Sequence, residues 1–237
     1  MSLLAVSGLR KQFGGVTALK DVHVVMKAGE TLGMIGPNGS VKTTFVNIVT
    51  GQFRADGGRI ELDGQDTFKL QPHRLARLGL TRTYQSVRVF AGLSARKNLD
   101  TARLLLADQG LSEGELAELT DWLRLDAALD KLAGSLTLFE QRRLELLMRL
   151  AQRPKLIMLD EPVGGLAVTE VREMIMLLQQ LKARCSVFII EHTMRVIREV
   201  ADRVVVLMAG EKIADGAPAV ILRDKRVIEH YLGAAHA

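Results

Sequence analysis

The chain has 237 residues, 48% of them hydrophobic and 25% charged, which is ordinary for a soluble globular protein and excludes a largely disordered one. Its formal net charge of +5 comes from basic residues interspersed with acidic ones, which favours a solvated surface over a nucleic-acid patch. The single cysteine, Cys185, excludes an internal disulfide, and no apolar run approaches the roughly 18 to 20 residues that cross a membrane.

The first elements are expected to be antiparallel strands. Residues 3–7 and 22–27 alternate or run apolar and are bounded by glycines, as strands typically are. Residues 59–62 precede Asp63-Gly64, a turn dipeptide that indicates a hairpin. We therefore expect an antiparallel β region near the N-terminus.

A candidate phosphate-binding loop follows a short apolar strand over residues 31–35 and precedes a helix that Gly51 ends. In such a loop, backbone N–H groups and the helix N-terminus surround the phosphates, Lys42 reaches the β- and γ-phosphates, and Thr43 offers a hydroxyl to Mg²⁺. A glycine-rich turn that happens to carry Lys-Thr is the alternative. The residues expected to bind nucleotide here are Gly36, Pro37, Asn38, Gly39, Ser40, Val41, Lys42, Thr43 and Thr44.

Val41 stands where the phosphate-loop motif has glycine. Valine keeps the backbone N–H but loses the backbone freedom of glycine. Holding a β-branched residue in a disfavoured conformation costs about 1 to 3 kcal/mol, or roughly 5- to 150-fold in nucleotide affinity if the bound form bears it all. We expect weak ATP binding and slow hydrolysis by this chain alone, both strengthened by Val41→Gly.

The pattern of apolar residues changes in the middle third of the chain. From about 91 to 152, Leu and Ala recur at helical spacing, which predicts an inserted helical region. Strands near 156–160, 186–190 and 203–208 and a helix near 168–184 then alternate, which predicts a parallel sheet. The expected fold is α/β: a P-loop NTPase core with an N-terminal antiparallel β subdomain and an inserted α-helical subdomain. The expected domain ranges are 1–90 for the first part of the core, 91–152 for the helical subdomain and 153–237 for the second part of the core.

Two adjacent carboxylates end the strand expected over 156–160. Asp160 and Glu161 would lie at the carboxyl edge of a parallel strand, where α/β sheets bind ligands. Asp160 can hold Mg²⁺ through water, and Glu161 can take the proton from an attacking water. A plain strand-to-turn exit is the alternative for this Asp-Glu-Pro in isolation. Its place after a phosphate loop favours an ATPase.

In this order, the motifs resemble those of the ATP-binding subunits of ABC transporters over nearly the whole chain. The resemblance implies that Phe13 stacks on adenine and that His192 contacts the γ-phosphate from the end of a strand. It also implies that Gln85 senses Mg²⁺ and the attacking water, so that Gln85, Thr43 and Asp160 are the expected metal residues. The implied catalytic residues are Glu161, His192 and Gln85, and the implied cofactors are ATP and Mg²⁺.

The signature segment of this family is present in altered form. Residues 136–143 read Leu-Thr-Leu-Phe-Glu-Gln-Arg-Arg, where the family has a Leu-Ser-x-Gly-x-Gln type sequence at a helix N-terminus that clamps the nucleotide of the opposite subunit. By resemblance, Thr137 and Gln141 keep their contacts to nucleotide. Phe139 replaces glycine, and its bulk is expected to hinder close phosphate approach. Ala167 departs as well, because the family has Asn or Asp at that position.

Within the ABC proteins, the stretches 13–19, 72–74, 78–85 and 227–233 resemble the ATPases of branched-chain amino acid importers. That resemblance implies an inner-membrane importer with transmembrane permease subunits, a periplasmic binding protein and usually a second ATPase. The chain itself would be cytoplasmic and peripheral on the inner face of the membrane. Close relatives transport urea, short amides and aromatic acids, and a lipopolysaccharide-export ATPase shares much of the pattern, so the substrate stays open.

Two functions are compatible with these residues. The first is a working transport ATPase, which Glu161 and His192 favour. The alternative is a degenerate subunit that supports assembly beside an active partner, which Val41, Phe139 and Ala167 favour. A homodimer would combine Val41 with Phe139 in both composite sites, so a heterodimer is favoured and a homodimer is possible. Nucleic acid is not expected as a partner, because the coiled-coil or zinc insert of DNA-repair ATPases is missing.

Overall fold

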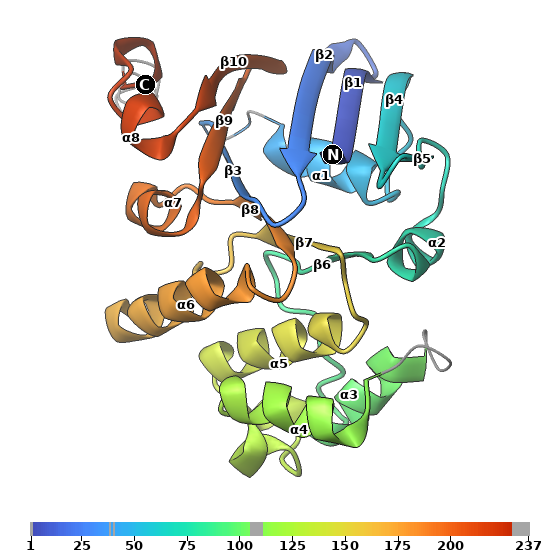
Figure 1. The fold of residues 1–237 in the computed structure, drawn as a ribbon, viewed down its shortest axis with the longest axis vertical. Coiled ribbons are helices and arrows are strands. Elements are labelled where there is room, and N and C mark those ends of the chain that lie inside the picture. The colour runs from blue at the N-terminus through green and yellow to red at the C-terminus, as the bar shows by residue number, and fades with distance from the viewer. Residues whose placement is uncertain (1, 38, 40, 105–110, 229–237) are drawn as a thin grey trace.

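The computed structural model describes residues 2–37, 39, 41–104 and 111–228 of the chain. Two β-sheets form the upper half of the view in Figure 1, and a group of helices forms the lower half. The strands are β1 (Ser2–Phe13), β2 (Val16–Lys27), β3 (Thr31–Ile35), β4 (Gly57–Leu62), β5 (Gln65–Asp66), β6 (Leu80–Arg82), β7 (Leu156–Asp160), β8 (Ser186–Ile190), β9 (Arg203–Met208) and β10 (Glu211–Gly216).

The N-terminal strands form the antiparallel sheet that was expected. Its order is β2-β1-β4-β5, with β1 antiparallel to both β2 and β4. Asp63-Gly64 turns β4 into β5, which confirms the predicted hairpin. Asp63 has φ 51° and Gly64 has φ 76°, so both turn residues take the left-handed conformation that Asp-Gly turns favour.

The second sheet has the order β10-β9-β3-β8-β7-β6. Neighbouring strands from β9 through β6 run parallel, and only β10 pairs antiparallel, at the edge. The predicted strands at 156–160, 186–190 and 203–208 are confirmed. Because the central strands are covered on both faces, they read as continuous apolar runs.

The helices are α1 (Lys42–Val49), α2 (Pro72–Arg77), α3 (Ala95–Arg103), α4 (Glu113–Trp122), α5 (Leu138–Leu150), α6 (Val168–Leu181), α7 (Met194–Val200) and α8 (Pro218–Ile221). Helices α3, α4 and α5 lie together in the lower half of Figure 1, within the range 91–152 expected to be helical. The domain boundaries themselves stay a prediction. Among the described residues, no helix has the length and apolar character needed to cross a membrane.

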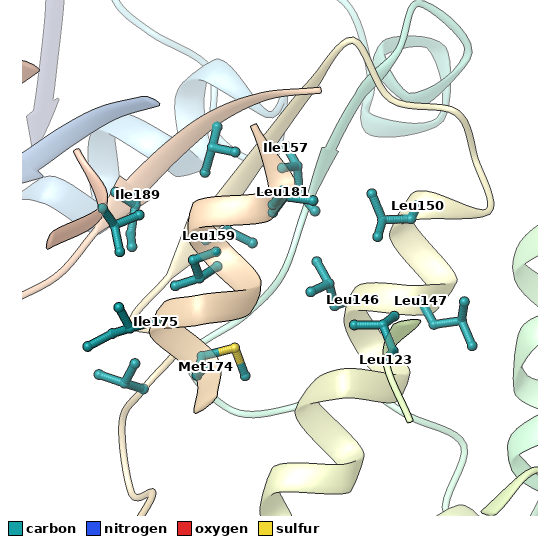
Figure 2. Close-up of a cluster of buried hydrophobic side chains, with 14 of the residues drawn as sticks. Leu123, Leu146, Leu147, Leu150, Ile157, Leu159, Met174, Ile175, Leu181 and Ile189 are labelled. Carbon is teal, nitrogen blue, oxygen red and sulfur yellow. The ribbon is translucent and has the colours of Figure 1, made fainter. Parts of the chain in front are cut away.

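The parallel sheet separates two hydrophobic cores. Along β7, Leu156 and Met158 face the core shared with α1 and the antiparallel sheet, whereas Ile157 and Leu159 face the core shared with α5 and α6. Figure 2 shows the second of these cores, in which side chains of α5 such as Leu146 point toward α6 and the sheet. This alternation follows from the two-residue period of a strand. Both faces of β7 are therefore buried, and its end carries the acidic pair.

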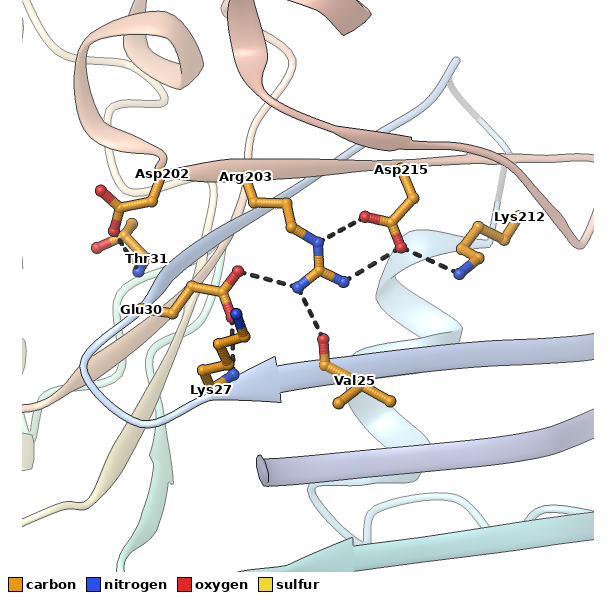
Figure 3. Close-up of polar contacts among 8 residues, drawn as sticks. All are labelled: Val25, Lys27, Glu30, Thr31, Asp202, Arg203, Lys212 and Asp215. Atoms are coloured by element: carbon orange, nitrogen blue, oxygen red, sulfur yellow. Dashed lines mark hydrogen bonds and ion pairs between the residues drawn. The ribbon is translucent and has the colours of Figure 1, made fainter. Parts of the chain in front are cut away.

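Arg203 ties the two sheets together (Figure 3). Its guanidinium donates to the carbonyl oxygen of Val25 at 3.0 Å and to Glu30 Oε1 at 2.9 Å, next to the turn between β2 and β3. It also donates to both carboxylate oxygens of Asp215 on β10, at 2.6 and 3.2 Å. Because the guanidinium of arginine has several N–H donors in a planar fork, this one side chain can bind β2, the turn after β2 and β10 at the same time.

Candidate functional site

The phosphate loop joins β3 to α1, as predicted. Gly36 and Pro37 follow β3, and the Nζ of Lys42 donates to their carbonyl oxygens at 2.6 and 3.1 Å. Burial lowers the pKa of Lys42, and the carboxylates of Glu161 and Asp160 oppose that shift. The lysine ammonium is thus held by the backbone of its own loop and attracted by the acidic pair at the end of β7.

The remaining loop residues are open to a ligand where the structure describes them. Asn38 and Ser40 lie outside the described residues. Gly39 has φ 77°, and a Cβ placed there would meet no atom within 4 Å. In the first turn of α1, Thr43 is exposed and Thr44 is half-buried. The Thr43 hydroxyl is therefore accessible at the helix N-terminus, where an anion is favoured.

Val41 has the strained backbone that the sequence predicts. It is the residue before α1, with φ 62° and ψ 22°, in the left-handed region. A β-branched residue with positive φ is an outlier, because its Cβ crowds the following carbonyl group. The strain is present without nucleotide, so nucleotide binding does not have to introduce it.

We therefore expect Val41→Gly to act mainly on stability. Relief of about 1 to 3 kcal/mol of strain, less about 0.5 to 1 kcal/mol for the freedom of glycine in the unfolded chain, leaves a net gain near 1 kcal/mol. ATP affinity should rise far less than the roughly 150-fold upper bound from sequence. Urea unfolding and calorimetric ATP titration measure the two effects, with Val41→Ala as an intermediate control. A large gain in affinity at unchanged stability would contradict this expectation.

Asp160 forms a buried ion pair that the sequence did not predict. Its Oδ2 lies 3.0 Å from Nη2 of Arg82, and both side chains are 6% exposed. Nη1 of Arg82 also donates to Asn47 Oδ1 at 2.6 Å and to Thr50 Oγ1 at 3.3 Å. Burial lowers the pKa of Arg82 and raises that of Asp160, and each partner opposes the shift of the other. The guanidinium thus connects the ends of β6 and β7 with α1, the helix that follows the phosphate loop.

The three expected catalytic side chains meet at the ends of β7 and β8. Nε2 of Gln85 donates to Oε2 of Glu161 at 2.8 Å, and Nδ1 of His192 lies 3.6 Å from Oε1 of the same carboxylate. Glu161 itself has φ 50°, and its backbone N–H donates to the carbonyl oxygen of Ile190 at 2.9 Å. One carboxylate therefore contacts both a glutamine and a histidine that lie far away in the sequence.

A second carboxylate holds the backbone of this region. Glu191 is fully buried, and burial raises its pKa. Its Oε1 accepts from the N–H of Val163 at 3.2 Å, and its Oε2 accepts from the N–H of Thr193 at 3.3 Å. Glu191 therefore links the loop after β7 to the loop that carries His192.

The donor atoms at this site suit Mg²⁺ bound together with a nucleotide. Mg²⁺ prefers oxygen ligands and usually takes one or two carboxylates plus substrate phosphates. Thr43 offers a hydroxyl, Gln85 an amide oxygen and Asp160 a carboxylate, of which Arg82 occupies one oxygen. In the described ranges, no group of three or more His, Cys, Asp or Glu is placed to hold a metal without such help.

Phe13, expected to stack on adenine, ends β1 as half of an aromatic pair. Its ring meets that of Phe53 edge to face, with centroids 5.7 Å apart, and the rings are 45% and 42% exposed. The ammonium of Lys11 lies 5.1 Å from the ring centroid of Phe13. An exposed aromatic surface of this kind can accept a base. The role of Phe13 stays a prediction.

The signature segment lies on α5, in the lower half of Figure 1 and away from α1. Thr137 caps the helix: its Oγ1 accepts from the N–H of Glu140 at 3.2 Å, and Glu140 Oε2 accepts from the N–H of Thr137 at 2.8 Å. Nε2 of Gln141 donates to the carbonyl oxygens of Ala133 and Leu136 at 3.1 and 3.2 Å. Gln141 is therefore engaged within the helical region, whereas Thr137 is exposed.

Phe139 does not block the N-terminus of α5, contrary to the expectation from its size. The side chain is 6% exposed and belongs to the core between the helices and the parallel sheet. The guanidinium of Arg143 lies 4.4 Å from its ring centroid. An aromatic ring gains more by burial than by standing in water at a helix end. The N-terminus of α5 is therefore not covered by this ring.

Ala167 precedes α6 and offers no side-chain cap. Its backbone N–H donates to Oε2 of Glu170 at 2.8 Å, which is half of a capping box. The missing Asn or Asp side chain thus removes one helix cap and leaves the helix itself intact.

Sequence reasoning missed several buried charged residues around the site: Arg82, Arg142, Glu145 and Glu191. The available signal was the position of Glu191, which directly follows the largely apolar strand Ser186–Ile190. Charged residues are rarely buried without an ion-pair or hydrogen-bond partner. Their partners could not be read from the sequence, since Arg82 and Asp160 are 78 residues apart.

Two family models match this chain. Residues 19–164 match the model described as ABC transporter, and residues 211–237 match that of the branched-chain amino acid ATP-binding cassette transporter. Both matches agree with the resemblance inferred from the motifs.

Curated relatives match over nearly the full length. The high-affinity branched-chain amino acid transport ATP-binding protein BraF of Pseudomonas aeruginosa is 36% identical and covers 98% of both chains. The corresponding protein LivG of Escherichia coli is 34% identical with the same coverage. Among solved structures, an ATP-binding cassette of an ABC transporter in its ADP conformation superposes with a TM-score of 0.88 at 28% identity, covering 98% of this chain and 99% of that one. A nucleotide-free cassette gives a TM-score of 0.86 at 26% identity.

Proposed function

The chain belongs to the ABC transporter ATPases, and from this premise we propose that it hydrolyses ATP to power an inner-membrane importer of branched-chain amino acids or related small solutes. The observation that carries the proposal is the contact of Glu161 with both Gln85 and His192 beside the phosphate-loop lysine. A base, an amide that can orient water and a phosphate-binding cation are the parts that phosphoryl transfer to water needs.

In the proposed reaction, the Glu161 carboxylate takes the proton from the water that attacks the γ-phosphorus, and ADP leaves in line with the attack. Gln85, already hydrogen-bonded to this carboxylate, orients the water. His192 is 54% exposed and can turn toward the γ-phosphate while staying near Glu161. These roles rest on the geometry around one carboxylate.

The phosphates would be held from the other side by the loop and by α1. Lys42 would leave the carbonyl oxygens of Gly36 and Pro37 to reach the β- and γ-phosphates. Thr43, Asp160 and Gln85 would hold Mg²⁺, which when bound neutralises the charge that develops on the phosphates. Phe13 would receive the adenine ring.

The site requires a second cassette, because the N-terminus of α5 is remote from α1 in the same chain. We place Thr137 against the nucleotide of that partner, with the dipole of α5 directed at the γ-phosphate. The argument for a heterodimer from Val41 and Phe139 no longer applies, because Phe139 is buried and the strain at Val41 is present without nucleotide, so a heterodimer and a homodimer are both compatible with this site. Permease subunits would hold the pair on the inner face of the membrane.

The branched-chain substrate class is supported by the C-terminal family match and by the names of the relatives. It is tested by uptake of radiolabelled leucine, isoleucine and valine in cells that lack this chain. We expect uptake to be lost and to be restored by the wild-type chain but not by Lys42→Ala. Restoration of uptake by Lys42→Ala would show that ATP binding by this chain is not needed for transport. Unchanged leucine uptake together with loss of uptake of another solute would show that the transporter carries that other solute.

A further inference from the structure

One buried arginine of α5 contacts two loops of the nucleotide site. Nη2 of Arg142 donates to the carbonyl oxygen of Gln85 at 3.2 Å and to that of Gly164 at 2.7 Å. The first loop carries a residue that contacts Glu161, and the second follows Glu161 directly in the chain. A single guanidinium on α5 thus forms hydrogen bonds with the Gln85 loop and with the loop that follows Glu161, the proposed base.

This arginine is buried without a carboxylate partner. It is 7% exposed, and none of the ion pairs among the described residues includes it. Burial lowers its pKa, and the more distant charges of Glu145, Glu191 and Glu161 oppose that shift. Taking a guanidinium out of water is unfavourable, so the place of Arg142 in the core depends on its hydrogen bonds to these two carbonyl oxygens.

The next turn of α5 brings a second buried charge to the Gln85 loop. Glu145 is 1% exposed, its Oε1 has no hydrogen-bond partner, and the backbone N–H groups of Arg88 and Tyr84 lie near its carboxylate. Burial raises the pKa of Glu145 to about 7, while Arg149 and these N–H groups favour its charged form. The carboxylate of Glu145 therefore lies close to the backbone on both sides of Gln85, and Arg142 provides the hydrogen bond from α5 to this loop.

Gly164, whose carbonyl oxygen accepts from Arg142, leaves little room for a side chain beside Glu161. A Cβ on Gly164 would lie 3.3 Å from the carbonyl oxygen of Glu161 and 3.5 Å from Nη2 of Arg142. A Cβ would therefore press on the carbonyl oxygen of Glu161, whereas its distance to Arg142 would be an ordinary van der Waals contact.

We propose that Arg142 is a positioning residue for ATP hydrolysis, which fixes the Gln85 and Gly164 loops to α5 so that the Gln85 amide stays aligned with Glu161. This inference rests on the proposed function for its consequence in catalysis. Its structural part, the fixing of two loops by one side chain, does not depend on hydrolysis. Any movement of α5 relative to the sheet would be transmitted to both loops through this guanidinium.

Arg143 provides a matched control on the same helix. It is 9% exposed, and its Nη1 donates to the carbonyl oxygens of Leu123 and Arg124 at 3.0 and 3.4 Å. It is thus as buried as Arg142 and makes the same number of carbonyl contacts. All of these contacts stay within the helical region, so its loss tests folding without touching the two loops.

The test compares Arg142→Met, Arg142→Lys and Arg143→Met in the full chain. Amide hydrogen exchange without nucleotide should become faster at residues 84–88 and 163–166 in Arg142→Met but not in Arg143→Met. In steady-state hydrolysis, Arg142→Met should lower kcat by about 10- to 100-fold, because small misplacements of reacting groups have effects of that size. ATP affinity should change little, and Arg142→Lys, which keeps the charge but loses the fork, should be intermediate.

The hydrogen-exchange rates and the kcat values of Arg142→Met and Arg143→Met test the role of Arg142 independently of the proposed transport function. Equal loss of kcat in Arg142→Met and Arg143→Met, or unchanged exchange in both loops, would overturn it. If Arg142→Met does not fold, the same comparison is made with Arg142→Lys. A wild-type chain that hydrolyses no ATP, alone or with its partner cassette, would refute the proposed function, while the exchange data would still show whether Arg142 holds the loops.

Discussion

Replacing Glu161 by Gln is expected to lower the rate of ATP hydrolysis by about 10²- to 10⁴-fold, the usual contribution of a general base. The amide has the same shape and can still accept the hydrogen bond from Gln85, but it cannot take a proton from water. ATP affinity should be little changed, because the loop and Lys42 are not touched. Single-turnover hydrolysis and nucleotide titration measure the two quantities.

Two further variants control this experiment. Glu199→Gln removes a carboxylate from α7 that pairs with Arg195, four residues earlier, and should leave hydrolysis unchanged. Glu161→Asp keeps the charge but withdraws it from Gln85 by one methylene group, and should be intermediate. Hydrolysis by Glu161→Gln at close to the wild-type rate would assign proton transfer to another group.

Arg82→Met is expected to lower the free energy of unfolding by about 3 to 5 kcal/mol, because it leaves a buried carboxylate without its partner. Both side chains of the pair are 6% exposed, so the carboxylate of Asp160 has little contact with water to compensate for the lost guanidinium. The variant also loses the hydrogen bonds to Asn47 and Thr50 of the α1 region. Urea unfolding of the nucleotide-free chain measures the loss.

A surface pair of the same length is the matched control. The Nε of Arg96 lies 3.0 Å from Asp130 Oδ1, but these side chains are 54% and 84% exposed, so Arg96→Met should have no measurable effect. The double variant Arg82→Met with Asp160→Asn should recover part of the stability, because the uncompensated charge is then gone. Equal stability of Arg82→Met and Arg96→Met would show that the buried pair does not stabilise the fold.

Local patterns predicted the framework of the site. The strand–loop–helix order around residues 31–49, the strand that ends at Asp160 and the Asp63-Gly64 hairpin all depend on residues close together in the sequence. Even the strain at Val41 was predictable, since the phosphate loop needs a left-handed backbone at that point and valine resists it. These features follow from short-range sterics and from the periodicity of apolar residues.

The direction of individual side chains was less predictable. Phe139 was expected at the phosphate-facing end of α5 because glycine is usual there, yet the ring is buried in the core. The sequence shows that a large residue occupies the second position of the helix. Which face of the helix it joins depends on the sheet and helices packed against it.

The sequence by itself determined the fold, the phosphate loop with its strained valine, and the identity of the acidic pair, because each depends on residues that are adjacent or periodically spaced in the chain. Only the tertiary structure decided that Arg82 pairs with Asp160, that Gln85 and His192 share the carboxylate of Glu161, and that Arg142 holds two loops. Arg142 and Gln85 are 57 residues apart in the chain, and Arg82 and Asp160 are 78 residues apart. Burial makes such contacts strong, and burial is a property of the packed molecule.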